Sequence, residues 1–381
     1  MLRTIDLEQA HAEDSALRDE LRRISLALAN SKKVVVITGA GISCSSGIPD
    51  FRTAGGIFTK KKRFGVKAQD VFSANVFQTT QGQQAFNQVM GELKEAIDQA
   101  QPTSAHQFVK QLYSKGTLLR SYSQNIDGLE ELAGIPEALT GNGRDINPDG
   151  KNVQLHGTIH KLKCFTCFVE SEWTEDFLST FKSGQAPKCP ACEKDQDPNR
   201  RRRNIGSLRP AIVMYDEDHP FGDDIARLQN HDKECQPDFL IVMGTSLSIP
   251  GLVKVVNFFA EDLQEDSILY VNKTTASATL SKPFGYHIHG EADLWVNMVF
   301  DDWGHTTTPT PPKTPAGSQL QGLDDEDPVY MIQLEACNQF LFLSLPVLIS
   351  SIPFHAEPTK AAVEVSCNQC PRIRNPPMAN G

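Results

Sequence analysis

The chain has 381 residues, which is enough for one large domain or two smaller ones with a hydrophobic core. Its net charge of −10 argues against direct nucleic-acid binding, because phosphate neutralisation needs clustered Lys and Arg, and suits a basic protein partner better. No apolar run is long enough to span a membrane, and the N-terminal residues lack a secretory signal pattern. We therefore expect a protein of a reducing intracellular compartment that acts away from membranes, with cysteines that are metal ligands or free thiols.

The predicted elements begin with an amphipathic helix over residues 14–30 and the fully apolar strand Val34–Thr38. Similar strands and helices alternate along the chain to about residue 300. Further strands are predicted at Leu118–Tyr122, Ala211–Met214, Phe239–Met243 and Ile268–Val271, and helices at Gln81–Ala100, Thr103–Tyr113, Gly222–Asn230 and Leu252–Asp262. This alternation indicates an α/β fold with a Rossmann-like, doubly wound parallel sheet.

Two segments interrupt the alternation. Residues 53–105 are largely polar or helical and are predicted to form a helical insert over the edge of the sheet. Residues 158–209 are rich in Cys, Lys and Arg and are predicted to form a smaller module. From residue 301 the sequence becomes Pro/Thr-rich and then acidic, so the folded domain is placed at residues 14–300 and residues 301–381 are predicted to be a disordered tail.

A glycine loop, GAGIS at residues 39–43, follows the first predicted strand directly. Glycines let the backbone approach a pyrophosphate, and the N-terminus of the next helix favours its negative charge. Considered alone, the loop could also be a tight turn without a ligand, since Cys44 replaces the third glycine of the usual dinucleotide fingerprint. A dehydrogenase would place an acidic residue about twenty positions further on, where this chain has Lys60–Arg63.

Four cysteines are arranged as two Cys-x-x-Cys pairs separated by 21 residues, Cys164 with Cys167 and Cys189 with Cys192. Two such pairs can complete a closed, tetrahedral zinc site. Because four thiolates leave no open coordination position, the zinc ion is predicted to be structural. Four unliganded thiols are the alternative.

Two further motifs carry candidate site residues. The sequence SQNIDG (residues 123–128) follows a predicted strand, at the sheet edge where ligands of open α/β folds bind, although it also fits a simple turn. His156 lies in LHG, where the glycine leaves room beside a ring that titrates near neutral pH. A single histidine is more often structural, and His160, without a flanking glycine, is expected at the surface near the cysteine module.

Several motifs, in order along the chain, resemble those of the sirtuin family. They are GAGIS and SGIPDFR within residues 39–52, QNID at 124–127, LHG at 155–157, the cysteine pairs, and GSLRPAIVMYDE at 206–217. The resemblance covers roughly residues 20–300, and the overall pattern, with the basic insert Lys60–Arg63, is similar to the fungal nuclear branch that deacetylates core histones. It implies an NAD-dependent protein-lysine deacetylase that consumes NAD, releases nicotinamide and forms O-acetyl-ADP-ribose. It also implies an acetylated protein partner, a histone, and a nuclear location, with the cytoplasm as the alternative.

The resemblance also assigns site residues. His156 would be the catalytic base, and Asn125 and Asp127 would orient water and the ribose end of NAD. The residues implied to hold NAD are Gly39, Ala40, Gly41, Ser43, Asp50, Phe51, Arg52, Gln124, Asn125, Asp127, Gly244, Thr245, Ser246, Asn272 and Ala292. Those implied to bind the substrate peptide are Val213, Met214, Tyr215, Asp216 and Glu217, of which Tyr215 and Asp216 depart from the Phe-Gly of the family.

Three alternatives concern the reaction itself. Sirtuins that remove acidic acyl groups resemble one another in a Tyr-x-x-Arg pair, which residues 81–96 lack, so acetyl or a longer apolar acyl group is favoured. ADP-ribosyl transfer to protein could occur on the same scaffold. A catalytically silent chromatin-binding scaffold is disfavoured by the presence of Asn125, Asp127 and His156.

Overall fold

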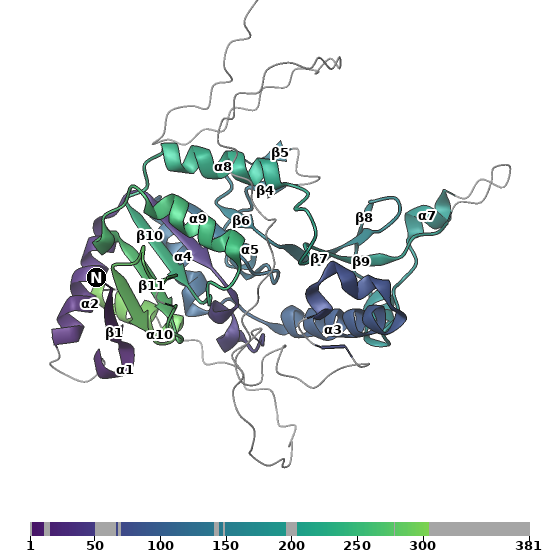
Figure 1. Cartoon of the computed structure of the whole chain (residues 1–381), viewed down its shortest axis with the longest axis horizontal. Helices are drawn as coiled ribbons and strands as arrows, with labels where there is room; N and C mark the ends of the chain where they lie inside the picture. The colour runs from purple at the N-terminus through teal and green to yellow at the C-terminus, as the bar shows by residue number, and fades with distance from the viewer. Residues whose placement is uncertain are drawn as a thin grey trace, which may run out of the picture.

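The computed structural model describes residues 2–10, 16–49, 66–67, 70–140, 145–147, 149–195, 204–277 and 279–304. In these ranges, seven parallel strands form one sheet in the order β1-β12-β11-β10-β2-β3-β6. The strands are β1 (Arg3–Asp6), β2 (Val34–Thr38), β3 (Leu118–Ser123), β6 (Asn152–Gln154), β10 (Phe239–Met243), β11 (Ile268–Asn272) and β12 (Tyr286–His289). The sheet and its helices form the larger lobe of the molecule, and a smaller lobe lies beside it (Figure 1).

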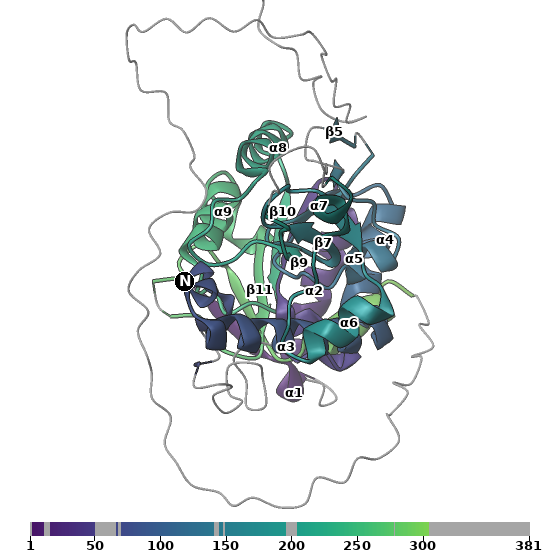
Figure 2. The ribbon, with the colours of Figure 1, turned by 90° about the vertical axis from the view of Figure 1, so that its right-hand side faces the viewer.

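Helices cover both faces of this sheet, so its strands are apolar on both sides. They are α1 (Leu7–Ala10), α2 (Ala16–Asn30), α4 (Ser104–Ser114) and α10 (Ala292–Asp302) on one face, and α8 (Gly222–Glu234) and α9 (Pro250–Ala260) on the other. Along β2, Val34 and Val36 pack with the first group of helices, whereas Val35 and Ile37 pack with the second. Figure 2 shows α4 and α9 on opposite sides of the strands. The predicted doubly wound parallel sheet is confirmed.

The smaller lobe combines a helical part with an antiparallel sheet. Its elements are α3 (Thr80–Gln99), α6 (Glu175–Lys182), α7 (Pro190–Lys194), β7 (Gly157–Cys164), β8 (Glu170–Glu172), β9 (Leu208–Ile212), and the short helices η4 (Asp70–Phe72) and η5 (Ala74–Gln78). The strand order is β8-β7-β9. A separate apolar cluster joins α3 to this sheet, with Phe86 and Met90 fully buried against Ile159 and Ile212.

The remaining short elements lie in the connections between these strands and helices. They are η1 (Ala40–Ile42), η2 (Cys44–Ser46), α5 (Leu129–Leu132), β4 (Leu139–Thr140), β5 (Asp145–Ile146) and η6 (Glu265–Ser267). No helix among the described residues is both long enough and apolar enough to cross a membrane. Residues 305–381, which include nearly all of the predicted tail, lie outside the described ranges.

One predicted strand belongs to a different sheet. Ala211–Met214 was expected in the large parallel sheet, but β9 ends at Ile212 and pairs antiparallel with β7 in the smaller lobe. Its residues alternate between buried and half-buried, which is the pattern of a strand covered on one face only. Its apolar content comes from packing against α3, as Ile212 and Met214 show.

A buried ion pair joins β3, the strand next to the β6 edge of the sheet, to α8. The guanidinium of Arg120 on β3 donates to both carboxylate oxygens of Asp232 on α8, with N···O distances of 2.8 Å for each. The hydroxyl of Tyr122 donates to the same carboxylate at 2.7 Å, and Arg120 also donates to the carbonyl of Gly150. The two ionic side chains are 4% and 0% exposed, so each depends on the other for its charge to be tolerated.

We expect Asp232→Ala to lower the free energy of unfolding by about 3–5 kcal/mol, because it leaves the Arg120 guanidinium buried without its carboxylate. Denaturant unfolding would measure the loss. Glu95→Ala is the matched control, since its partner Lys182 and Glu95 itself are both more than 40% exposed, and it should cost less than about 1 kcal/mol. Equal losses in the two variants would contradict this view of the pair.

Candidate functional site

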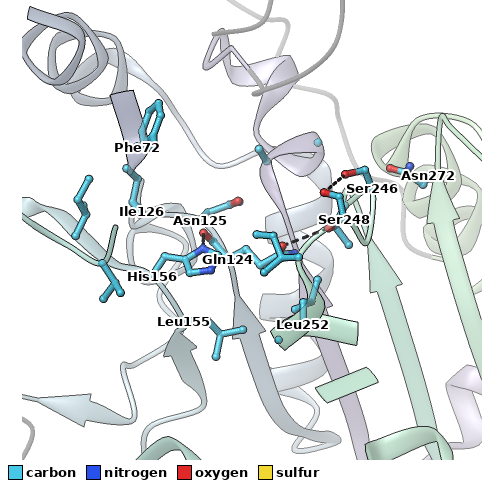
Figure 3. A pocket seen from close by; sticks show the side chains of 18 of the residues that line it. Phe72, Gln124, Asn125, Ile126, Leu155, His156, Ser246, Ser248, Leu252 and Asn272 are labelled. Atoms are coloured by element: carbon cyan, nitrogen blue, oxygen red, sulfur yellow. Dashed lines mark hydrogen bonds between the residues drawn. The ribbon is translucent and has the colours of Figure 1, made fainter. Parts of the chain in front are cut away.

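A cavity of about 1030 Å³ lies where the carboxyl ends of the parallel strands face the smaller lobe. Ala40, Gln124, Gly244, Asn272 and Gly290 line it, and each follows or ends a strand, β2, β3, β10, β11 and β12 respectively. Ligands of open α/β sheets bind at this edge. In Figure 3, Phe72, Ile126 and His156 lie at one end of the cavity and Ser246 and Asn272 at the other.

The glycine loop packs against the turn after β10 with no room for side chains. The N–H of Gly41 donates to the carbonyl of Gly244 at 2.8 Å. A Cβ atom on Gly39 would lie 2.8 Å from the Gly244 carbonyl oxygen, and one on Gly41 would lie 2.8 Å from the Gly244 Cα. Real Cβ atoms essentially never approach so closely, so glycine is required at both positions. The main chain at Ala40 and Gly41 is thereby left open towards the cavity, as an approaching phosphate needs.

A buried hydrogen-bonded network supports this loop from below. The Ser43 hydroxyl donates to the Asp127 carboxylate at 2.7 Å, and the Asn125 amide nitrogen is 3.2 Å from the Ser43 oxygen and 3.3 Å from the Gly39 carbonyl. Asn125 lines the cavity, whereas Gly39, Ser43 and Asp127 do not appear on its wall within the described chain. The amide donors of Asn125 face the loop, so its Oδ1 is the atom suited to accept a hydrogen bond from water or a ribose hydroxyl.

His156 has a defined tautomer. Its Nδ1 lies 2.8 Å from the backbone carbonyl oxygen of Gln124, which can only accept, so Nδ1 carries the proton and Nε2 has the lone pair (Figure 3). Burial lowers the pKa of His156, and the hydrogen bond to Gln124 partly opposes that shift. The ring is therefore neutral near pH 7, with Nε2 available as a proton acceptor.

Gln124 connects three strand ends. Its side-chain nitrogen donates to the carbonyl of Thr38 at 2.9 Å, and its side-chain oxygen accepts from the Thr245 hydroxyl at 3.3 Å. The carbonyl that holds His156 therefore belongs to a residue that is itself fixed by the turns after β2 and β10.

The segment that follows β9 forms the rim beside His156. Val213 donates its N–H to the His156 carbonyl at 2.9 Å, and Tyr215 exchanges main-chain hydrogen bonds with Phe72 and Ala74. Val213, Met214 and Tyr215 line the cavity. Asp216 and Glu217 have structural contacts instead. Asp216 has a positive φ of 68° and accepts from Ser73, and Glu217 forms a bidentate pair with Arg209 at 2.7 and 2.9 Å.

The far end of the cavity includes the predicted Ser246, Asn272 and Ala292. Asp293, which the sequence analysis did not select, anchors this end. It accepts a hydrogen bond from the N–H of Ala105 at 2.7 Å and one from the Ser45 hydroxyl, so it joins η2, which follows the glycine loop, to the start of α4. Its position directly after Ala292, which the sequence analysis did select, was the available signal. Asp50, Phe51 and Arg52 lie outside the described residues.

His160 is not a surface residue, contrary to the prediction. It is half-buried, and its Nε2 donates to the backbone carbonyl of Asp127 at 2.7 Å. Its ring also occupies the space beside Gly128, where an added Cβ would lie 2.9 Å from it. His160 on β7 therefore holds the end of the QNID turn, whose start is held by His156.

The four cysteines converge on one point in the smaller lobe. Their sulfur atoms all lie within 4.8 Å of one another, with Cys164 to Cys192 at 3.7 Å and Cys167 to Cys189 at 3.6 Å. Tetrahedral zinc with Zn–S bonds of about 2.3 Å requires sulfur separations of about 3.8 Å. The N–H groups of Thr166 and Cys192 also point at cluster sulfurs, as they do around thiolates. The residues therefore fit the predicted closed zinc site.

We expect Cys189→Ser to reduce the zinc content from one ion per chain and to lower the melting temperature, because the four ligands together complete a site that holds α7 against the end of β7. Elemental analysis with a parallel thermal melt would measure both. Cys44→Ser, which changes a cysteine outside the cluster, is the control and should retain the zinc. Full zinc content in the Cys189 variant would contradict a Cys₄ site.

The fold and the site together define a class of protein. A strand-end cavity with a glycine loop is the site expected of an α/β protein that binds a dinucleotide, and a separate four-cysteine module accompanies it. The Sir2 family model matches residues 39–250, and this chain belongs to the Sir2 family.

Two curated relatives support this assignment, and a solved structure shares the fold. The NAD-dependent histone deacetylase HST3 of Candida albicans is 34% identical over 302 residues, which is 74% of this chain and 61% of that protein. HST3 of Saccharomyces cerevisiae, also an NAD-dependent histone deacetylase, is 35% identical over 303 residues, or 73% of this chain and 67% of that one. The solved structure of a Sir2 variant with a deacetylated p53 peptide and 3′-O-acetyl ADP ribose has a TM-score of 0.58 at 24% identity, covering 75% of this chain and 99% of that chain. The chain thus spans about two thirds of the length of these curated relatives.

Proposed function

We propose that this protein is an NAD-dependent protein-lysine deacetylase that acts on acetylated histones in the nucleus. The observation that carries the proposal is His156, a neutral imidazole with its Nε2 lone pair available, in the same cavity as the glycine loop. The relatives that the chain resembles are histone deacetylases by name, which supports a histone substrate and a nuclear location.

NAD would supply the ribose carbon at which nicotinamide is replaced by the acetyl oxygen of the substrate lysine. The chain's own contribution follows from the described contacts. The loop at Ala40 and Gly41 would receive the phosphates, and Asn125 would orient a ribose hydroxyl or water through its Oδ1. His156 Nε2 would take the proton from a ribose hydroxyl, while the Gln124 carbonyl stabilises the imidazolium that results. Asp127 would act indirectly, by fixing Ser43 and the loop.

The lining of the cavity near His156 favours an uncharged acyl group. Phe72, Ile126 and Ile212 lie there, and the one lysine or arginine on the described wall is Lys273, next to Asn272 at the opposite end. Among the residues that the structure describes, a carboxylate-bearing acyl chain would find no lysine or arginine beside His156. Acetyl or a longer apolar acyl group is therefore the proposed substrate group, in agreement with the missing Tyr-x-x-Arg pair.

Two other functions make different predictions for one experiment. An acetylated histone peptide is incubated with the protein and NAD, and the products are analysed by mass spectrometry. O-acetyl-ADP-ribose with free lysine supports deacetylation. ADP-ribose attached to protein, without formation of O-acetyl-ADP-ribose, would indicate ADP-ribosyl transfer. If NAD is not cleaved at all, the protein is a catalytically silent scaffold.

We expect His156→Ala to reduce peptide deacetylation by at least about a hundredfold, because proton transfer by a positioned base contributes roughly 10²–10⁴ in rate. The variant should keep its zinc and its thermal melt, since the cysteine cluster lies in a separate apolar core. The measurement is the rate of acetyl-ADP-ribose formation. Wild-type activity in this variant would exclude His156 as the base.

The rate should also depend on pH through His156. Only the neutral ring accepts a proton, and burial lowers its pKa from 6.5, so kcat/KM should rise with pH through a midpoint below 6.5 and stay level above it. Initial rates between pH 5 and 9 would test this, with zinc content measured at pH 5 to separate protonation from metal loss. A midpoint above 6.5 would contradict the assignment.

A further inference from the structure

A second histidine, His219, lines the cavity that contains His156. It lies between β9 and α8, on the same segment as the proposed peptide-binding residues Val213–Glu217. Burial, and secondarily the charge of nearby His156, lower the pKa of His219 to about 4. His219 is therefore neutral at physiological pH, and its partner in that electrostatic interaction is the ring of His156.

The tautomer of His219 follows from its neighbours. The N–H of Phe221 donates to Nδ1 at 3.0 Å, so the proton of the neutral ring is on Nε2. That Nε2 is buried and makes no hydrogen bond within the described chain, although the backbone of Gln154 is close enough to raise the pKa of the ring. A buried donor without a partner is destabilising, so the protein would gain stability if a hydrogen bond to the Gln154 carbonyl formed.

Gln154 ends β6 and is two residues before His156. The segment between β9 and α8 therefore approaches the turn that carries His156 at two points. The N–H of Val213 binds the His156 carbonyl at 2.9 Å, and His219 faces Gln154 from the other end of the segment. On the opposite side, the Gln124 carbonyl fixes the His156 ring.

We propose that His219 is a positioning residue that couples the peptide-binding segment to His156. Peptide bound along Val213–Glu217 would press the segment against the turn, close the contact between His219 Nε2–H and the Gln154 carbonyl, and hold the His156 ring in place. Catalytic hydrogen bonds that are long in the free protein commonly tighten in the substrate complex. This inference rests on the proposed deacetylase function.

His219 is poorly suited to a direct chemical role. Its Nδ1 accepts from Phe221, and its Nε2 is inaccessible to solvent. With a pKa of about 4 it would also be a weak base at working pH. Its effect on the reaction must therefore pass through His156.

Three substitutions of His219 distinguish the contribution of its Nδ1 from that of its Nε2. His219→Leu removes both hydrogen-bonding groups. His219→Asn keeps an acceptor for the Phe221 N–H, as in an Asx turn, but is too short to reach Gln154. His219→Gln has an amide donor long enough to reach the Gln154 carbonyl. His231→Leu is the matched control, because His231 is a buried histidine on α8 that does not line the cavity.

We expect His219→Leu and His219→Asn to lower kcat by about ten- to a hundredfold, the cost of a small misplacement of a catalytic group, with KM for NAD within about twofold of wild type. His219→Gln should recover most of kcat, and His231→Leu should match wild type per zinc-loaded chain. A wild-type kcat in His219→Leu, a wild-type kcat in His219→Asn, or a loss confined to KM for NAD would each overturn the proposal.

A measurement independent of turnover completes the test. Histidine ¹⁵N spectra, with the His219 signals assigned by their absence in His219→Gln, should show the Nε2–H tautomer and slower proton exchange once acetylated peptide is added. The Nδ1–H tautomer, or exchange unaffected by bound peptide, would overturn the coupling. A wild-type protein that forms no acetyl-ADP-ribose yet shows this spectrum would contradict the deacetylase function instead.

Discussion

The cavity depends on the close approach of two backbones, the glycine loop after β2 and the turn after β10. The Gly41 N–H meets the Gly244 carbonyl at 2.8 Å, and neither Gly39 nor Gly41 has room for a Cβ. Because β2 and β10 are neighbours in register, from Phe239 opposite Val34 to Met243 opposite Thr38, both turns begin at the same level of the sheet. A fully apolar pair of strands thus fixes two polar loops against each other, and the remaining site residues are arranged around that contact.

Sequence patterns predicted the strands whose side chains are buried on both faces of the sheet. β2, β10 and β11 are apolar nearly throughout, and each was predicted within about one residue. β1, β6 and β12 were missed because they are three or four residues long and partly polar, and only pairing with a neighbour defines them. β9 was recognised as a strand but given to the wrong sheet, because a short apolar run indicates burial without identifying its partner.

The site residues were predictable from sequence where the residue type and its spacing indicate a single chemical role. The spacing of the four cysteines predicted a cluster that the structure confirms. The QNID and glycine-loop motifs located the cavity but did not distinguish its wall from its support, since Ser43 and Asp127 lie behind Asn125. His219 could not be found from sequence, because its relation to His156 arises only when the chain returns after β9.

The support beneath the loop has a further electrostatic consequence. Asp127 and Glu130 lie within 4.8 Å of each other and of His106, and burial raises the pKa of both carboxyl groups while it lowers that of His106 to about 4. Each of the three groups is thus shifted towards its neutral form. Two fully ionised carboxylates directly behind the loop would repel a pyrophosphate in front of it, and in a low-dielectric interior that repulsion is weakly screened. Two buried acids that accept hydrogen bonds from Ser43 and Thr38, and whose pKa values burial raises, can anchor the loop with less opposition to an anionic ligand than two acids of ordinary pKa.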